Sequence, residues 1–407
     1  MNICFLTTEF PSPEKPEGGL GNYTNNISQE LIKRGNNITI IALGRKSKVQ
    51  DFDSIRIRFI KRSRINWRIK KLCNKFKNFS LFENLIDSVK IKKVVYEENS
   101  NNKFDLIQTP NFNFPGNALI NDKEIPVVCR CSSCSPLLRS ANGLPTTFSE
   151  YIYDWFEVRQ VLKSSSSFTP SKFIAKMYQK IYGLKPLVIR SPIRLKNFDE
   201  DYSIFNNLVH KKDYLLFFGR LNLVKGVDIF IDSLPRILKK YQDLSVLFIG
   251  ENDLLTDGHN SLDLMKEKLS NYISEKRVVY SPSIPKNQLF PIIKNSMGVV
   301  IPSRVDNYPN SCLEAFPLGI PVIGSNESSL EEIVTDGQTG FLFENGSSDD
   351  LQNAIDKLIN LNPDQRKEFN NNIKYDVQSF LEEDRVASLE NYYHTVINNF
   401  QTSKGSI

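Results

Sequence analysis

The chain has 407 residues, and at roughly 100 to 200 residues per domain this length suggests two domains, which we take as the starting point, or three. Its composition, 40% apolar and 24% charged, is that of an ordinary globular protein and excludes a disordered or fibrous chain. The net charge of +6 is mild and no apolar run approaches the roughly 18 residues that span a bilayer, so we expect a cytoplasmic protein, or one attached peripherally to the inner face of a membrane.

The N-terminal part of the chain predicts a strand, a loop, a helix and a second strand. "NICFLTT" is a short apolar run typical of a buried strand, and the Pro- and Gly-rich "EFPSPEKPEGG" predicts a loop. "LGNYTNNISQELIKRG" has apolar residues at helical spacing and ends at Gly35, which can take the left-handed conformation that closes a helix. With "NITIIALG" as the next strand, this alternation predicts a parallel sheet whose ligands gather at the carboxyl ends of its strands.

A basic run extends from Arg56 to Lys77, with ten Lys or Arg residues and no acid. Apolar residues recur within and just after it at positions 65, 69, 72, 76 and 79, which is close to helical spacing. The run is therefore either a helix whose cationic face is solvated or a surface that rests on an anionic partner such as a membrane.

The alternation of elements then resumes. "FDLIQTP", "IPVVCRC" and "PLVIRSPI" predict strands, and "SSSFTPSKFIAKMYQKIYG" predicts a short strand followed by a helix. After a polar connector the pattern restarts at "DYLLFFG", so we place a domain boundary near Ile193. The predicted domains are residues 1–192 and 193–380, and residues 381–407 form a C-terminal helix for which packing back on the first domain is one option.

The second half repeats the strand and helix pattern of the first. Strands are predicted at "LSVLFIGEND", "RVVYSPSIP", "GVVIPS" and "IPVIGSN", and "GFLFENGSSDDLQNAIDKLI" predicts a strand, a capped turn and a helix. The remaining tail is predicted to be largely helical. The expected fold is therefore α/β, with two doubly wound, Rossmann-like halves that face each other across a cleft.

Three cysteines lie close together in "VVCRCSSCSP", at positions 129, 131 and 134. A zinc site needs about four nitrogen or sulfur ligands, and neither a second Cys pair nor a Cys/His pair follows nearby. We therefore expect small buried residues at a strand end and no metal site.

Both halves contain a Gly-rich loop that enters a helix, where backbone N–H groups and the helix dipole attract phosphate. The loops are "PEGGLGNY" in the first half and "GRLNLVKGV" in the second, which adds the cations Arg220 and Lys225. Neither the P-loop pattern nor the dinucleotide pattern GxGxxG occurs. Taken alone, "PEGGLGNY" is also explained as an ordinary turn.

The stretch "PSRVDNYPNSCLEAF" lies further along the same predicted sheet. Its Pro309 suits a first helical position, so the next residues, Asn310, Ser311 and Cys312, are expected to offer free N–H groups to a phosphate. Glu314 would repel a phosphate at close range and is better suited to accept hydrogen bonds from hydroxyls, as is Asp306 on the preceding loop. A molecule with hydroxyls, a diphosphate and further hydroxyls is a nucleotide sugar.

"GRLNLVKGVD", "PSRVDNYPNSCLEAFPLGIPVI" and "EEIVTDGQTGFLF", in that order, resemble the donor-binding domain of the family-four retaining glycosyltransferases of GT-B fold. "PEGGLGNYTNNISQELIKRGNNITII" resembles the opening of their acceptor domain. The resemblance is dense in the second half and confined to the ends of the first. It implies a GT-B fold with an N-terminal acceptor-binding domain and a C-terminal donor-binding domain.

The resemblance also implies roles for individual residues. Arg220 and Lys225 would hold the donor diphosphate and neutralise the leaving group without a bound metal, while Asp306, where the family usually has Glu, would lie near the sugar hydroxyls. Glu314 would bind the ribose. The remaining donor contacts would come from backbone groups and from glycines that let the loop approach the phosphates, at Asn307, Tyr308, Ser311, Cys312, Leu313, Gly18 and Gly19.

Two departures from the family pattern concern the acceptor side and a Gly-Gly pair. Relatives often carry a His after a strand near the middle of the first domain, where this chain offers Ser132 or Ser133, and its histidines at 210, 259 and 394 lie in no motif. Where relatives have Gly-Gly before the "EIV" segment, this chain has Ser328 and Ser329. Ser132 and Ser133 are therefore weak candidates for the acceptor side.

The predicted function is transfer of a hexose, with retention, from a UDP- or GDP-linked donor to a cell-surface glycan or lipid-linked acceptor in polysaccharide biosynthesis. No cofactor is expected, because the nucleotide sugar is a substrate, and no nucleic acid partner is expected. Two alternatives remain open. One is a nucleotide-sugar epimerase of the same fold, and the other is a non-catalytic subunit that binds a nucleotide sugar.

Overall fold

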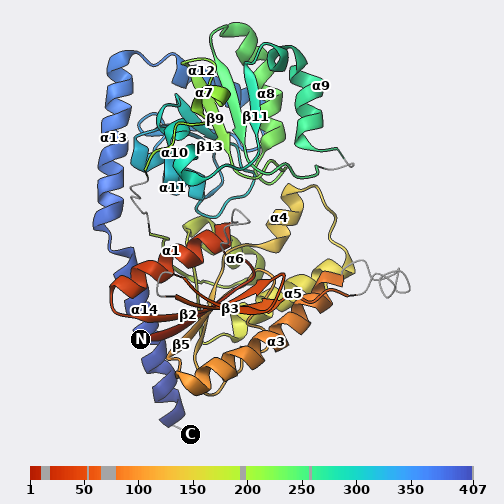
Figure 1. The fold of residues 1–407 in the computed structure, drawn as a ribbon, viewed down its shortest axis with the longest axis vertical. Coiled ribbons are helices and arrows are strands. Elements are labelled where there is room, and N and C mark those ends of the chain that lie inside the picture. The colour runs from red at the N-terminus through yellow and green to blue at the C-terminus, as the bar shows by residue number, and fades with distance from the viewer. Residues whose placement is uncertain (11–18, 53–54, 66–78, 193–198, 256–258, 406–407) are drawn as a thin grey trace. The chain divides into compact units, whose positions relative to one another are not determined.

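The computed structural model describes residues 1–10, 19–52, 55–65, 79–192, 199–255 and 259–405 (Figure 1). The chain forms two compact units, each with its own sheet. The first comprises Met1–Pro136, Pro145–Pro192 and Asp384–Ile407, and the second comprises Leu137–Leu144 and Ile193–Glu383. In both units helices pack on a mainly parallel sheet, which confirms the predicted α/β class of two Rossmann-like units.

The sheet of the first unit has the strand order β3-β4-β2-β1-β5-β6-β7-β8 among the described residues. Every neighbouring pair is parallel except β3 and β4. The strands are β1 Asn2–Thr7, β2 Asn37–Gly44, β3 Lys48–Phe52, β4 Ile55–Lys61, β5 Leu106–Pro110, β6 Val127–Arg130, β7 Ser166–Thr169 and β8 Leu187–Val188.

Helix α1 makes the crossover between β1 and β2, as the sequence pattern predicts. It buries Ile27 and Leu31 against these strands and ends before Gly35, which takes the left-handed conformation with φ of 85°. The other helices that carry residues of this unit are α3 Phe79–Asn101, α4 Ser135–Ala141, α5 Phe148–Lys163, α6 Lys172–Tyr182 and α14 Arg385–Gly405, and α1 itself spans Gly19–Lys33.

The C-terminal helix α14 belongs to the core of the first unit (Figure 1). Its residues Val386, Leu389, Tyr393 and Val396 pack in one apolar cluster with β1, β2 and α1. The buried Tyr393 hydroxyl donates to the Gln108 side chain on β5. The chain therefore returns to its N-terminal unit after passing through the second one.

The sheet of the second unit is parallel throughout, with the order β11-β10-β9-β12-β13-β14 in the described part of the chain. The strands are β9 Tyr214–Phe218, β10 Ser245–Ile249, β11 Val278–Ser281, β12 Gly298–Ile301, β13 Val322–Ser325 and β14 Gly340–Phe343. The helices are α7 Phe205–Leu208, α8 Val227–Lys240, α9 Ser261–Ser274, α10 Lys286–Lys294, α11 Asn310–Ala315, α12 Ser348–Ile359 and α13 Pro363–Glu382, with short 3-10 helices η2 Phe316–Leu318 and η3 Ser329–Glu332.

Two apolar layers cover the faces of this second sheet. Helices α8, α9 and α12 pack on one face, where Phe230 lies against Phe217 and Phe248. Helices α10 and α11 pack on the other, where Ile292 and Cys312 are fully buried. Since both faces are covered, loops at the carboxyl ends of the strands are the natural place for polar side chains.

The start of the basic run lies in a strand and not in a helix, while positions 69, 72 and 76 of the predicted helical spacing lie outside the described residues. Residues 56 to 61 lie in β4, and residues 66–78 lie outside the described part of the chain. Alternation in "IRIRFIK" explains the difference, because Ile55 and Ile57 are buried while Arg56 is exposed, as a half-buried strand requires. In the described ranges no helix has both the length and the apolar character needed to cross a bilayer.

Candidate functional site

The site is built on two neighbouring strands of the second unit. β9 and β12 run parallel, with Leu215 paired to Gly298. Their carboxyl ends therefore lie at the same edge of the sheet, and the loops that follow them, residues 219–226 and 302–309, are neighbours. At Gly226 (φ 66°) an added Cβ would lie 1.8 Å from the Pro302 carbonyl oxygen, so only glycine allows the two loops to approach so closely.

Lys225 and Asp306, predicted from separate motifs, meet across these loops. The Lys225 Nζ lies 2.6 Å from Asp306 Oδ2. The same carboxylate accepts hydrogen bonds from the Ser303 hydroxyl at 2.9 Å and from the Asn307 N–H at 3.0 Å. Asp306 is 8% exposed, whereas the Lys225 side chain is 34% exposed, so a buried carboxylate is paired with a lysine that still reaches solvent.

Arg220 lies on the same loop as Lys225 and forms a two-pronged ion pair with Asp253, which follows β10. Its Nε and Nη2 donate to the two carboxylate oxygens at 2.8 and 2.7 Å, and Asn222 adds a third hydrogen bond at 3.0 Å. Burial alone would raise the pKa of Asp253, but the bonds from Arg220 and Asn222 outweigh it and hold that pKa below the ordinary value. Asp253 thus orients the guanidinium at the sheet edge.

Helix α11 starts at Asn310, one residue later than predicted: Pro309, expected at the first helical position, precedes the helix with an extended backbone. The Cys312 N–H, expected to be free, is not: it donates to the Pro309 carbonyl at 3.1 Å, as the Leu313 N–H does at 3.2 Å. The first turn of the helix is already closed by these bonds, so the N–H of its third residue is not available to a ligand. Cys312 and Leu313 are also buried, and burial raises the pKa of the Cys312 thiol. Only Asn310 and Ser311 remain as N–H candidates in this turn.

Glu314 lies one turn into α11 and is paired with a lysine that the sequence analysis did not single out. Lys286, the first residue of α10, places its Nζ 2.8 Å from Glu314 Oε1. Tyr308 is held by Ser329, one of the two serines noted at the Gly-Gly position: the Ser329 hydroxyl accepts from the Tyr308 N–H at 2.6 Å and donates to the Asp306 carbonyl at 3.0 Å. Tyr308 is buried and has a φ of 63°, so this serine fixes a strained turn.

Two glycines of the first unit, Gly18 and Gly19, were predicted to let their loop approach the phosphates. Gly18 lies outside the described residues, and Gly19 is the exposed first residue of α1. At the same helix start, the Glu9 carboxylate accepts from the Gly21 N–H at 3.3 Å. An acid therefore already interacts with the first turn that the sequence analysis considered for phosphate.

Ser132 and Ser133 follow β6 and are organised by Asn111, which follows the neighbouring β5. Asn111 Oδ1 accepts from the Ser132 N–H at 2.7 Å, and Asn111 Nδ2 donates to the Ser133 carbonyl at 2.9 Å. The Tyr178 hydroxyl donates to that carbonyl as well, at 3.0 Å. The two serines are half-buried, and their loop is fixed by the buried side chains of Asn111 and Tyr178.

The three neighbouring cysteines are buried and form no disulfide with one another, as expected for small residues at a strand end. Burial raises the pKa of the Cys129 thiol to about 12, which disfavours the thiolate form that binds metals. In the part of the chain that the structure describes, no cluster of His, Cys, Asp or Glu has the arrangement of a metal site.

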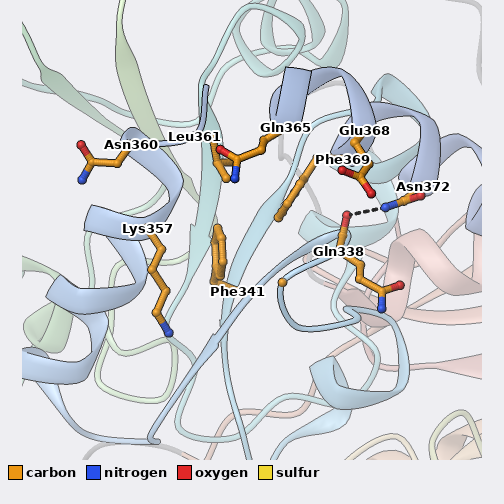
Figure 2. Close-up of a pocket in the computed structure, with 10 residues that line it drawn as sticks. Gln338, Phe341, Lys357, Asn360, Leu361, Gln365, Glu368, Phe369 and Asn372 are labelled. Carbon is orange, nitrogen blue, oxygen red and sulfur yellow. Dashed lines mark hydrogen bonds between the residues drawn. The ribbon is translucent and has the colours of Figure 1, made fainter. Parts of the chain in front are cut away.

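A cavity of about 620 Å³ lies elsewhere on the second unit, between β14, α12 and α13 (Figure 2). Its lining includes the paired rings of Phe341 and Phe369, whose centroids are 5.4 Å apart, and the turn at Gly337 before β14. This turn lies at the amino end of an edge strand, opposite the carboxyl ends that carry Lys225 and Asp306. The cavity shares no residue with the predicted donor site.

Several residues of the site were missed by sequence reasoning. The sequence does indicate Asp253, because it lies at the end of "LSVLFIGEND", which predicts a strand that ends at the same edge as Arg220. The sequence indicates Lys286 less clearly, as the first residue of the helix that follows the next strand, β11. Ser303 and Asn111 act through a single hydroxyl or amide group, and no local pattern indicates them. Ser329 was noted only as a departure from the family's Gly-Gly pair, without its role in holding Tyr308.

Two units, each with helices packed on a mainly parallel sheet, are the arrangement of a GT-B fold, and cations and acids meet at the carboxyl edge of the second sheet. A family model described as "Glycosyl transferases group 1" matches residues 199–376, and one described as "Glycosyltransferase Family 4" matches residues 17–196. The chain belongs to this family of glycosyltransferases, which confirms the resemblance seen in its motifs.

Relatives and solved structures agree with that assignment. The chain is 23% identical to an uncharacterized glycosyltransferase, MJ1607, of Methanocaldococcus jannaschii over 95% of this chain and 96% of that protein. It is 25% identical to alpha-1,3/1,6-mannosyltransferase ALG2 of Dictyostelium discoideum over 58% of this chain and 62% of that protein. The fold is similar to sucrose-phosphate synthase of Thermosynechococcus elongatus, with a TM-score of 0.78 at 16% identity over 98% of this chain and 100% of that one. It is also similar to Anabaena HepE in complex with UDP-glucose, with a TM-score of 0.64 at 17% identity over 100% of both chains.

Proposed function

We propose that this glycosyltransferase moves a hexose from a UDP- or GDP-linked donor to a cell-surface glycan or lipid-linked acceptor, with retention of anomeric configuration. The observation that carries the proposal is the Lys225–Asp306 pair, with Arg220 and Glu314 at the same edge of the sheet. Cations and hydroxyl-binding acids alternate there as a diphosphate between a sugar and a ribose requires.

In this proposal the cations of the loop after β9 act on the leaving group. As the bond between the anomeric carbon and the diphosphate oxygen breaks, negative charge grows on the diphosphate. Lys225 and Arg220 stabilise that charge more in the transition state than in the ground state, so they accelerate the reaction. Two positive side chains supply the charge compensation that a divalent metal supplies elsewhere.

The acids of the site orient the donor. Asp306, held by Ser303 and the Asn307 N–H, accepts hydrogen bonds from sugar hydroxyls, and Glu314 accepts them from the ribose. The acceptor hydroxyl oxygen attacks the anomeric carbon on the face from which the diphosphate departs. Its proton passes to an oxygen of the departing diphosphate, so no carboxylate nucleophile is required.

Proteins similar to this chain support the choice of donor and acceptor. HepE was crystallised with UDP and with UDP-glucose, and a trehalose-6-phosphate protein of Escherichia coli with UDP-2-fluoro glucose. CapM of Staphylococcus aureus, 29% identical over 40% of this chain and 42% of that protein, is described as a capsular polysaccharide biosynthesis glycosyltransferase. The ligands of the first two proteins support a UDP-linked hexose donor, and the description of CapM supports a glycan acceptor.

A panel of UDP- and GDP-hexoses, incubated with and without glycan and lipid-linked acceptors, tests the proposal. A transferase releases free nucleoside diphosphate and raises that release when the right acceptor is added. An epimerase changes the sugar without net release, and a binding subunit does neither while still retaining the donor in an equilibrium binding assay. Acceptor-dependent release from at least one donor is the expected result.

We also propose that the protein is cytoplasmic and contacts an anionic membrane surface through the basic run. In its described part, Arg56 and Arg58 are paired with Glu98 and Glu97 on α3, at 2.8 and 3.3 Å, so they are poorly placed for a membrane. Lys61 and Arg64 are exposed and remain as candidates, each worth about 1 kcal/mol at an anionic surface.

Sedimentation with anionic and with neutral vesicles, at low and high salt, tests this contact. The protein should pellet with anionic vesicles at low salt, and the double variant Lys61→Gln, Arg64→Gln should pellet less. The matched control is Arg56→Gln, which removes a cation of the same run that is already paired. Equal recovery in every supernatant would remove the membrane from the proposal.

A further inference from the structure

Arg304 connects the two loops of the site and has no role in the donor contacts proposed so far. It follows β12 and lies two positions before Asp306 in "PSRVD". Its Nη1 and Nη2 donate to the two oxygens of Asp228 at 2.7 and 2.6 Å, and Nη1 also donates to the Leu223 carbonyl at 2.7 Å. Asp228 belongs to the first turn of α8, so the guanidinium bridges the loop and helix that follow β9.

The backbone of Arg304 is fixed as firmly as its side chain. Its N–H donates to the Val224 carbonyl at 2.9 Å, and its carbonyl accepts from the Asn345 side chain at 2.9 Å. Asn345 follows β14, so three loops of the sheet edge meet at this one residue. The two sides of the ion pair are only 27% and 22% exposed, which protects it from solvent screening.

The backbone on both sides of Lys225 is fixed by contacts with the loop that follows β12. On its N-terminal side, Leu223 and Val224 are bonded to Arg304. On its C-terminal side, Gly226 leaves no room for a Cβ against the Pro302 carbonyl. The position of the Lys225 backbone relative to the loop that carries Asp306 is thus set from both sides.

We propose that Arg304, with Asp228 as its partner, is a positioning residue for glycosyl transfer. It fixes the spacing between Lys225 and Asp306 and thereby places the diphosphate-binding cation relative to the sugar-binding acid. The proposal rests on the proposed function of these two residues. The planar guanidinium meets both carboxylate oxygens and the carbonyl from two separate nitrogens, and the single nitrogen of lysine does not reproduce this geometry. A misplacement of about 1 Å in such a site can cost about a hundredfold in rate.

Arg304→Lys keeps the charge and removes the fork, so it is the central variant. We expect kcat to fall about a hundredfold with the donor KM changed less than about threefold, because alignment is lost while the donor-binding groups remain. Arg366→Lys is the matched control. Arg366 is another half-buried arginine of the same unit that donates to backbone carbonyls, those of Leu358, Ile359 and Leu361, on elements remote from the site. Its kcat should stay within about threefold of wild type.

Two further variants keep the test decisive if Arg304→Lys folds poorly. Asp228→Asn leaves the Leu223 and Val224 bonds in place and should lower kcat less than Arg304→Lys. Guanidinium added at low millimolar concentration should restore activity to Arg304→Ala about tenfold or more, but should not restore it to Lys225→Ala, where an amine at a different position is lost.

Equal kcat in Arg304→Lys and wild type, or equal losses in the Arg304 and Arg366 variants, would overturn the positioning role. A purely structural role would lower the melting temperature of both arginine variants without separating kcat from KM, and that outcome also counts against the proposal. Failure of the wild-type protein to release nucleotide from any donor is a different result, because it contradicts the proposed function itself.

Discussion

Lys225→Ala separates the catalytic from the structural contribution of the ion pair with Asp306. The ammonium is 2.6 Å from a carboxylate that is 8% exposed, so its removal has two consequences. Loss of one cation aimed at a developing anion costs about a hundred- to a thousandfold in turnover, which is about 2.7 to 4 kcal/mol in the barrier. Asp306 also loses its countercharge, but it keeps the bonds from Ser303 and Asn307. We therefore expect a stability loss of about 1 to 2 kcal/mol, below the 3 to 5 for a fully buried pair.

Two matched variants complete this test, with initial rates of nucleotide release and thermal melts as the readouts. Lys240→Ala removes the last residue of α8, which lies about 20 Å along the helix from Lys225. Its Nζ is also 2.6 Å from an aspartate, Asp356 on α12. That pair is more exposed and should contribute less than about 1 kcal/mol, with turnover unchanged. Adding Asp306→Asn to Lys225→Ala should restore melting temperature but not turnover. Turnover of Lys225→Ala within a few-fold of wild type would refute the diphosphate-binding role.

Three further predictions follow from single residues. Glu314→Gln should weaken binding of the cognate nucleotide about tenfold by calorimetry while leaving the melting curve nearly unchanged, and the reverse pattern would indicate a structural glutamate paired with Lys286. Gly226→Ala should lower both stability and turnover, because its Cβ would meet Pro302. Gly337→Ala, with a similar φ of 70° and nothing within 4 Å, should lower the free energy of unfolding by only about 1 kcal/mol. Equal effects of the two variants would contradict the contact between the loops. Hydrogen bonds from the Ala387 N–H and from Arg34 lower the pKa of Asp384 below its ordinary 3.8, so its stabilisation is present above that value and is lost as pH falls through the lowered pKa. Asp384→Asn should therefore melt below wild type at pH 7, and a gap that stays constant down to pH 3 would refute this assignment.

Elements with strong periodicity could be predicted from the sequence. The apolar runs at β1, β2, β9 and β12 identify buried parallel strands, and the stripe of α8 identifies its helix, because burial on both faces leaves a continuous apolar signature. The strand at the start of the basic run was not predicted, because Arg56 and Arg58 lie on its more exposed face and pair with glutamates about 40 positions later. Helix α3, which supplies those glutamates, shows little amphipathic contrast and was missed.

The site could be predicted where charge and loop position coincide in sequence. Lys225 and Asp306 lie on loops that follow strands, and Glu314 lies in the short helix after the second loop, so topology brings them together at the carboxyl edge of the sheet. The supporting contacts could not be predicted in the same way. Ser329 fixes Tyr308 from 21 positions away, and Arg304 reaches Asp228 from 76 positions away, and both depend on how the loops fold over one another.

A crystal structure of the protein with the nucleoside diphosphate of its preferred donor is the most direct test of the central claim. We predict that the diphosphate contacts Arg220 and Lys225, that the ribose hydroxyls donate to Glu314, and that Lys225 moves from Asp306 toward phosphate. A nucleotide bound elsewhere, for example in the cavity beside Phe341 and Phe369, with Lys225 still paired to Asp306, would contradict it.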